Sequence, residues 1–344
     1  MASRSTAGGP SARIDYLVPD YDRPSWGIAL LYEHVRLLRE LGYDARVLHH
    51  RAPFRVRWLE QSAVPVAHLD ALDREPSSAD VVVVPEVIAA QAARLPFAWR
   101  RVVFVQGSFL IPGGLDGAAD YRGLGYERAL AVLPHVASVV ERHFGVGADV
   151  VPPFIAPYFF RDGEAIRQQP RQRIVLFVMK PEYRRVGFPD YDIFMRLTRE
   201  RFADRAGRGQ REGGWRLMEL DGSLSHALVA DLMAEASFLV NLNSHEAFNT
   251  TVPEAMAAGC IPICYDAFGG RDFLLDGENA FVFPNHHVYP LVEKTLAVTG
   301  DDAGDETLLA MRLRARDTAG RYDVGGTRDA LAQVFQRLMT SRAS

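Results

Sequence analysis

Short apolar runs separated by helical or irregular segments recur along nearly the whole chain, and this alternation limits the fold more than any other feature. Residues 14–18 have the composition of a buried strand, and apolar residues at three- and four-residue spacing then predict a helix that Gly42 ends. The helix positions are Ile28, Leu31, Val35 and Leu38, and further apolar runs lie at 45–48, 81–84, 102–105, 130–133 and 150–151. This pattern predicts a parallel sheet covered by helices on both faces.

A second series of the same kind follows a break. Pro152, Pro153 and Pro157 interrupt the pattern, and the polar stretch 161–173 has the composition of a linker. Strands are then predicted at 174–179, 215–220, 238–242, 261–265 and 280–283, and closing helices at 308–321 and 327–339. We expect a flexible tail at 1–12, a Rossmann-like domain at 13–160, a linker at 161–172, a second Rossmann-like domain at 173–305 and closing helices at 306–344.

The length fits two doubly wound α/β domains, since 344 residues suffice for two cores. Facing each other, such domains form a cleft, and open parallel sheets bind ligands beyond the carboxyl ends of their strands. A net charge of -4 gives no reason to expect a nucleic acid partner.

Neither a membrane span nor a secretory leader is expected. No apolar run approaches the roughly 18 residues that cross a bilayer, and the start of the chain lacks a signal peptide's apolar core. We therefore expect a cytoplasmic protein, with peripheral membrane contact left open. Cys260 and Cys264 lie in an apolar segment without further metal ligands, so we expect them to pack in the core.

The stretch after the strand at 238–242 carries the candidate chemistry. A helix is predicted to open at Thr250 or Thr251 and to run to Gly259, with Pro253 in its first turn. Free backbone N–H groups and the positive end of the helix dipole suit a diphosphate. Glu246 in the preceding loop and Glu254 in the first turn can face one ligand from two directions.

Each of these residues also has a plain structural interpretation. Thr251 and Glu254 have the spacing of a capping box, in which the glutamate only satisfies a backbone donor. Glu246 alone fits a solvated loop residue, and His245 beside it fits an ordinary surface or half-buried histidine.

About forty contiguous residues resemble a known signature. The run from Glu246 through Glu254 to Pro262 looks like the E-x7-E motif of retaining GT-B glycosyltransferases, particularly glycosyltransferase family 4, and the similarity continues through Phe268-Gly-Gly and 276–284. The resemblance implies that Glu246 approaches the donor sugar and that Glu254 bonds the ribose hydroxyls. The residues between them, Phe248, Asn249, Thr250 and Thr251, would offer N–H groups to the diphosphate, and His245 joins the expected donor site.

A cation pair opens the same predicted domain. Lys180 and Arg185 follow the strand at 174–179 at the spacing that the family has, and Arg184 takes the place of Arg185 if the register shifts by one. Basic residues in a loop are commonly just solvated. Beside the E-x7-E motif, however, the charge of these residues suits a departing nucleoside diphosphate. Lysine stands where the family usually has arginine, which keeps the charge but loses the fork geometry.

The first predicted domain matches the family more weakly. Gly27 alone stands where the family has a glycine pair after its first strand, and Gln106 stands where many relatives carry a histidine. Gln106 can bond a sugar hydroxyl but cannot act as a base. A GxGxxG fingerprint is absent, which argues against a dinucleotide-binding dehydrogenase.

The resemblance implies a retaining hexosyltransferase that moves a sugar from a nucleotide-diphosphate sugar to an acceptor hydroxyl. The donor motifs contain no D-x-D triplet, so we expect neither a metal nor a cofactor. Two other classes stay open: another enzyme on the same fold, such as a sugar-nucleotide epimerase or a phosphorylase, and a catalytically silent transferase-like subunit. A hydrolase with paired carboxylates fits less well, because the helix start and the cations suit a phosphate. Glycan, lipid-linked and small-molecule acceptors are all compatible, and the sequence indicates no donor base, donor sugar or oligomeric state.

Overall fold

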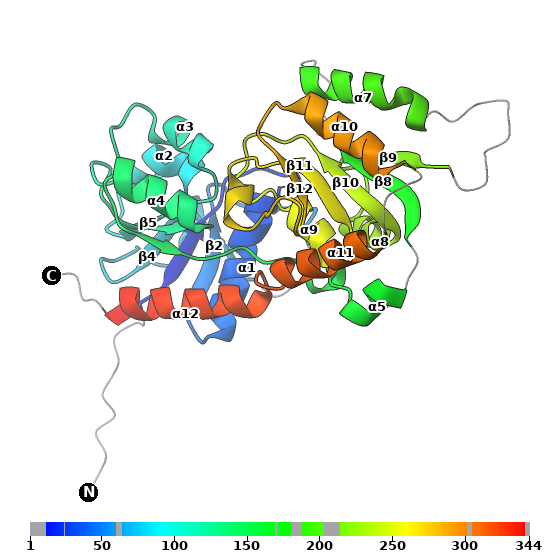
Figure 1. Cartoon of the computed structure of the whole chain (residues 1–344). Coiled ribbons are helices and arrows are strands. Elements are labelled where there is room, and N and C mark those ends of the chain that lie inside the picture. The colour runs from blue at the N-terminus through cyan, green and yellow to red at the C-terminus, as the bar shows by residue number, and fades with distance from the viewer. Residues whose placement is uncertain are drawn as a thin grey trace, which may run out of the picture. The chain divides into compact units, whose positions relative to one another are not determined.

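The chain folds into two compact α/β units. The computed structural model describes residues 12–23, 25–59, 64–168, 171–179, 188–202, 214–300 and 305–340. Unit 1 comprises Met1–Pro153 together with Gly325–Ser344, and unit 2 comprises Phe154–Val324. Each unit contains one parallel sheet flanked by helices, as the alternating apolar runs predict (Figure 1).

Unit 1 contains a seven-stranded parallel sheet of order β3-β2-β1-β4-β5-β6-β7. Every residue of β1, β2 and β4 is buried, as expected when both faces are covered. The strands are β1 (Ile14–Leu17), β2 (Ala45–His49), β3 (Val66–His68), β4 (Val81–Pro85), β5 (Arg100–Val105), β6 (Tyr126–Ala131) and β7 (Ala148–Val150). The helices are α1 (Trp26–Glu40), α2 (Ala89–Ala93), α3 (Ile111–Leu115), α4 (Pro134–His143) and α12 (Val324–Thr340), and 3-10 turns lie at η1 (Leu69–Ala71), η2 (Glu86–Ile88) and η3 (Ser108–Leu110).

The predicted helix after the first strand is confirmed. It begins after Ser25, whose side chain accepts a hydrogen bond from the Ile28 N–H, and it ends before Gly42, which adopts a φ of 89°. Three strands differ from expectation. β7 spans Ala148–Val150 instead of 150–151. The sequence pattern gave no sign of β3, because its residues are only half buried, and β6 ends at Ala131 instead of continuing to 133.

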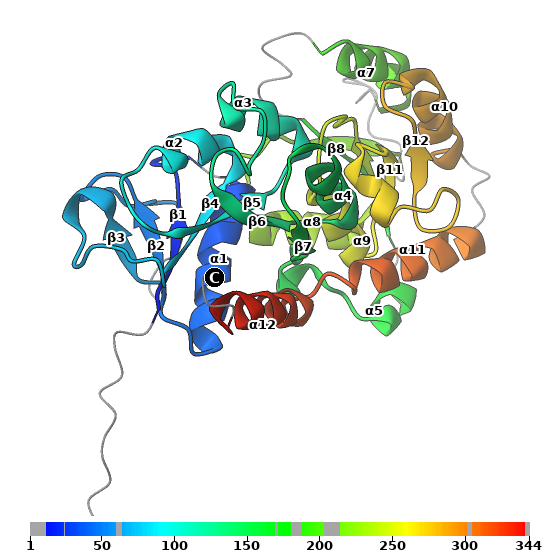
Figure 2. The same cartoon turned by 90° about the vertical axis from the view of Figure 1, so that its left-hand side faces the viewer.

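The last helix, α12, completes the core of unit 1 (Figure 2). The ring of Phe335 is fully buried and lies 6.5 Å from the ring of Tyr16 in β1 and 6.2 Å from that of Tyr43. Farther along the helix, Arg337 pairs with Asp149 at 2.8 Å. The chain therefore returns to its first sheet after building the second.

Unit 2 contains a five-stranded parallel sheet of order β12-β11-β10-β8-β9. Its strands are β8 (Gln172–Val178), β9 (Arg216–Leu220), β10 (Ala236–Asn241), β11 (Ile261–Tyr265) and β12 (Phe281–Phe283). Helices α7 (Pro189–Phe202) and α10 (Val288–Val298) cover one face, and α8 (His226–Glu235) and α9 (Thr251–Ala257) cover the other (Figure 1). Helix α11 (Asp305–Ala319) packs against α9 and against α5 (Gly163–Gln168), and short 3-10 turns lie at η4 (Pro157–Phe159) and η5 (Gly269–Asp272).

Arg171 fixes the carboxyl ends of α8 and α9. Its guanidinium donates to the carbonyl oxygens of Met233 and Ala234 at the end of α8 and to that of Ala258, at 2.8 Å, after α9. Burial lowers the pKa of Arg171 to about 10. A half-buried cation thus interacts with the negative ends of two helix dipoles, one of which belongs to the helix that starts at the candidate site.

The division between the units falls earlier than the linker expected at 161–172. It lies between Pro153 and Phe154, and helix α5 occupies half of the expected linker. The stretch has the composition of a linker because Ile166 is the one buried residue of α5.

Candidate functional site

The loops that follow β10, β11 and β12 meet at the carboxyl edge of the sheet in unit 2. Glu246 pairs with Phe268 as an isolated bridge, in which its N–H donates to Ala267 and its C=O accepts from Gly269. Asn285, after β12, donates to the Ser244 carbonyl at 2.9 Å and accepts from the Ala267 N–H at 3.2 Å. Three loops therefore form one connected edge, where a parallel sheet is expected to bind its ligand.

Gly269 is required for the close approach of these loops. A Cβ atom at this position would lie 1.7 Å from the Ala247 carbonyl oxygen. Only glycine allows the loop after β11 to lie directly on the loop after β10. The packing of these two loops therefore explains why the first glycine of the Phe268-Gly-Gly motif is a glycine.

A network of three asparagines shapes the turn into α9. Asn249 adopts a φ of 53°, and its Oδ1 accepts from the side-chain amides of Asn241 at 3.0 Å and Asn243 at 3.4 Å. Asn241 in turn accepts from the backbone N–H of Asn243 at 2.9 Å. Sequence reasoning missed Asn241 and Asn243, although polar residues at the end of an otherwise apolar strand were a usable signal.

Helix α9 begins without a side-chain cap. Thr250 is its N-cap residue and makes no side-chain hydrogen bond, so Thr251 and Glu254 do not form the capping box that their spacing suggests. Within the described part of the chain, no hydrogen bond engages the N–H groups of Phe248, Asn249, Thr250 or Thr251. The ring of Phe248 packs on Tyr322 at 4.9 Å, so its backbone alone is available to a ligand.

Glu254 is the most unusual group at this edge. It is 8% exposed, and no described residue forms a hydrogen bond or ion pair with its carboxylate. Burial raises the pKa of Glu254 to about 8. A buried acid without a partner is costly, and such groups concentrate at functional sites.

Glu246 and His245 lie beside this buried acid in the sequence but are more accessible. Glu246 is half buried and His245 is exposed. The Nδ1 atom of His245 lies 2.8 Å from the Ser244 hydroxyl, and its ring lies 6.1 Å from that of Phe268. Lys180, Arg184 and Arg185, the predicted cations, lie outside the described residues.

In unit 1 the structure brings Gly27 and Gln106 together. The Gln106 amide donates to the Gly27 carbonyl oxygen at 3.2 Å, which links the carboxyl ends of β5 and β1. Both residues therefore lie near the carboxyl edge of their own sheet, where open parallel sheets commonly bind ligands.

The sequence does contain two D-x-D triplets outside the donor motifs, at 20–22 and 190–192. Asp20 accepts from the N–H groups of His50 and Arg51, and Asp22 binds Arg57. Asp190 accepts from the Tyr265 hydroxyl at 2.9 Å. Over the described ranges, no group of three or more histidine, cysteine or acidic side chains is arranged to hold a metal ion.

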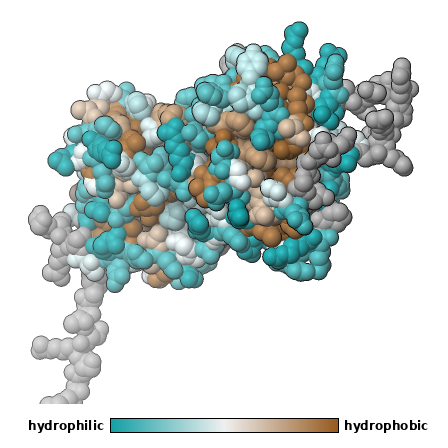
Figure 3. Space-filling model, in the orientation of Figure 1, coloured by the Kyte–Doolittle hydropathy of each residue, from teal (hydrophilic) through white to brown (hydrophobic). Residues whose placement is uncertain are grey.

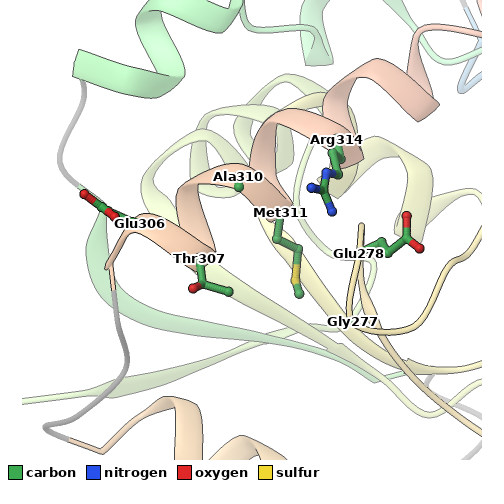
Figure 4. A pocket seen from close by; sticks show the side chains of 7 residues that line it. All are labelled: Gly277, Glu278, Glu306, Thr307, Ala310, Met311 and Arg314. Carbon is green, nitrogen blue, oxygen red and sulfur yellow. The ribbon is translucent and has the colours of Figure 1, made fainter.

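A separate hollow lies away from the predicted residues (Figure 4). It has a volume of about 340 Å³, and α11 lines it together with the turn before β12. Its lining residues are Gly277, Glu278, Glu306, Thr307, Ala310, Met311 and Arg314, none of which belongs to the E-x7-E segment.

On the face drawn in Figure 3, hydrophilic residues are spread over both units with apolar residues among them. None of the helices in the described ranges is long and apolar enough to cross a bilayer.

Part of unit 2 is similar in sequence to known glycosyltransferases. Residues 218–317 match the family Glycosyl transferases group 1. Over 115 residues the chain is 30% identical to the GDP-mannose:cellobiosyl-diphosphopolyprenol alpha-mannosyltransferase of Komagataeibacter xylinus, a stretch that covers 33% of this chain. The chain thus matches only 29% of the length of that relative.

Solved structures resemble the chain over nearly its whole length. Alr3699/HepE of Anabaena in complex with UDP-glucose has a TM-score of 0.69 at 15% identity and covers 94% of this chain and 99% of its own. Sucrose-phosphate synthase from Thermosynechococcus elongatus has a TM-score of 0.68 at 12% identity, with 96% and 100% covered. A glycosyltransferase from Rickettsia africae ESF-5 has a TM-score of 0.65 at 12% identity, with 97% and 100% covered. These likenesses confirm the GT-B fold.

Proposed function

We propose that this protein is a retaining glycosyltransferase that moves a sugar from a nucleotide-diphosphate sugar to an acceptor hydroxyl without a metal ion. The observation that carries the proposal is the buried, unpartnered carboxyl group of Glu254 at the start of α9. It lies within the stretch that matches Glycosyl transferases group 1. Because the capping box is not formed, the carboxyl group has no structural task among the described residues.

A nucleotide would supply the missing partners. Two vicinal ribose hydroxyls donate to a carboxylate, which suits Glu254, and the N–H groups of 248–251 suit the diphosphate at the helix start. Glu246 would hold the donor sugar, and Lys180 with Arg185 or Arg184 would neutralise the departing diphosphate. All of these roles follow the resemblance to the family, and for Glu254 and 248–251 the burial and the N–H groups left free by the described residues support them.

In the proposed reaction, the acceptor oxygen attacks the anomeric carbon on the face from which the nucleoside diphosphate leaves. The bond to the leaving phosphate breaks, and a phosphate oxygen takes the acceptor's proton, so the anomeric configuration is kept. The protein contributes positioning and electrostatic stabilisation. Gln106 and Gly27 in unit 1 would contact the bound sugar.

A thermal-shift panel of nucleoside diphosphates and their sugars tests the proposal. The panel includes GDP-mannose and UDP-glucose, because one relative uses the former and one similar structure holds the latter. We expect at least one diphosphate to stabilise the protein, by about 2.7 kcal/mol at a hundredfold excess over its Kd. Glu254→Ala should abolish this shift. If no nucleotide stabilises the wild-type protein, the proposal fails.

The metal-free part of the proposal has its own test. Turnover should be the same with and without a chelator, and added magnesium should not change it. Strong inhibition by the chelator that magnesium reverses would contradict this part. Anomeric analysis of the product tests retention.

A further inference from the structure

Glu86 is a buried acid in unit 1 to which the proposed function gives no role. It is the first residue of η2, directly after β4, at the carboxyl edge of the sheet. It is 1% exposed, and burial raises the pKa of Glu86 to about 7. Carboxyl groups are seldom buried so completely, so the position calls for a specific partner.

The partners of Glu86 are two backbone N–H groups at the end of β5. Its Oε1 atom accepts from Gln106 at 3.1 Å and from Gly107 at 2.9 Å. The pairing of β4 with β5 ends at Pro85 and Phe104, so β4 offers no carbonyl oxygen to the N–H groups of Gln106 and Gly107. The Glu86 carboxylate takes that place and fixes the backbone at Gln106.

The side chain of Gln106 is held against the first turn of α1, the helix that follows β1. Its Nε2 atom donates to the Gly27 carbonyl oxygen at 3.2 Å. A Cβ atom at Gly27 would lie 2.7 Å from Gln106 Oε1, so the carboxamide occupies space that only glycine leaves. Glu86, Gln106 and Gly27 therefore join the carboxyl ends of three neighbouring strands.

Helix α3 closes the other side of Glu86. A Cβ atom at Gly114 would lie 1.7 Å from the Glu86 carbonyl oxygen, so α3 packs directly on η2. Tyr121 is the titratable neighbour, and its pKa is raised by burial and by the charge of Glu86. Among the described residues no charged side chain acts on Glu86, whose ionisation depends on burial and on hydrogen bonds from backbone N–H groups.

We propose that Glu86 is a positioning residue that holds Gln106 in the orientation in which its carboxamide bonds a hydroxyl of the bound sugar. The inference rests on the proposed function. Glu86 does not touch the substrate and acts through the backbone of Gln106. The ionised carboxylate accepts the two N–H bonds more strongly than the protonated form, so the hold on Gln106 weakens as the pH falls below about 7.

Steady-state kinetics of Glu86→Gln in two backgrounds test this role. In the otherwise wild-type protein, we expect kcat/KM to fall about 10- to 100-fold, as for a misplaced positioning group. The Kd of the nucleoside diphosphate should not change. In the Gln106→Ala background, the same substitution should have almost no effect on kcat/KM. An equal loss in both backgrounds would mean that Glu86 is merely structural.

The pH profile gives a second readout. Relative to Glu86→Gln, wild-type kcat/KM should decline as the pH falls below about 7. Identical profiles would contradict the inference. Asp15→Asn is the matched control, because Asp15 is also 1% exposed in unit 1 but pairs with Arg46 at 2.6 Å in the middle of its strand. It should lower stability and leave kcat/KM unchanged.

Gly27→Ala provides a variant that leaves Glu86 intact, should Glu86→Gln not fold. Alanine is well tolerated in the first turn of α1, but its Cβ displaces the Gln106 carboxamide. We expect a loss of kcat/KM similar to that of Glu86→Gln, and an unchanged value would overturn the inference. A wild-type protein that turns over no nucleotide sugar contradicts the proposed function and the inference with it. Normal wild-type turnover with equal losses in both backgrounds contradicts the inference alone.

Discussion

Replacing Glu254 with glutamine should stabilise the protein while abolishing nucleotide binding. Folding raises the pKa of Glu254 from 4.5 to about 8 because the carboxyl group is buried. The folded state therefore binds the proton more tightly than the unfolded state. Below pH 4.5 the carboxyl group is protonated in both states, so its ionisation does not lower the free energy of unfolding. As the pH rises from 4.5 to about 8, the free energy of unfolding falls, because the unfolded state releases the proton more readily. Glutamine has the same shape and never ionises.

The size of the effect follows from the shift. Each pKa unit corresponds to 1.36 kcal/mol, so Glu254→Gln should gain about 3 kcal/mol at pH 7 and about 5 kcal/mol above pH 8. For a domain the size of unit 2, 1 kcal/mol raises Tm by about 2–4 °C. We therefore expect a rise of about 6–12 °C at pH 7 and almost none near pH 4.5.

Thermal unfolding of both proteins at a series of pH values measures this difference. Glu278→Gln is the control, since Glu278 is an exposed carboxylate in the same unit and should change Tm little at any pH. The reasoning is refuted if the gain from Glu254→Gln is absent, or if it is as large at pH 4.5 as at pH 8. A stabilised variant that still binds the nucleoside diphosphate would separate burial from function and remove the role proposed for Glu254.

Three further outcomes are expected. Gly269→Ala should lower Tm and eliminate nucleotide binding, because its Cβ would lie 1.7 Å from the Ala247 carbonyl oxygen. If the variant binds the nucleotide as well as the wild-type protein does, the loops after β10 and β11 can separate without loss of the site. Asn249→Gly keeps the φ of 53° but loses two side-chain hydrogen bonds, so urea unfolding should show that the free energy of unfolding falls by about 1–3 kcal/mol. Asn249→Ala should lower it further, because alanine disfavours a positive φ. Equal losses would mean that the backbone conformation contributes nothing. Arg171→Met should cost at least about 2 kcal/mol in the same assay, because buried carbonyl oxygens lose their donor, and a neutral result would contradict the clamp on α8 and α9.

The elements whose faces are fully buried could be predicted from the sequence. β4 and β11 are apolar throughout because helices cover both sides of each sheet, so composition alone marks them, and β1 departs from this pattern only at the buried Asp15. β3 could not be predicted from the sequence, because its residues are half buried and form no apolar run. α5 could not be predicted either, because a helix with one buried residue, Ile166, has the composition of a linker.

The site could be placed from the sequence but not characterised. The loop between β10 and α9 follows from a strand, a turn and a proline-marked helix start. The burial of Glu254 and the positive φ of Asn249 depend on residues distant in sequence, and no local pattern reports them. Glu86 could have been predicted, since a carboxyl group directly after five apolar strand residues lies where open parallel sheets bind ligands.

The placement of α12 has a consequence for how the chain is made. Unit 2, at 154–324, is contiguous, so a ribosome has delivered nearly all of it when the synthesis of α12 begins at Val324. Unit 1 begins to emerge first, yet the rings of Tyr16 and Tyr43 lack Phe335 until α12 has been synthesised. The first unit to appear is therefore the last to close its core. Its unfinished apolar surface is open to chaperones throughout the synthesis of unit 2.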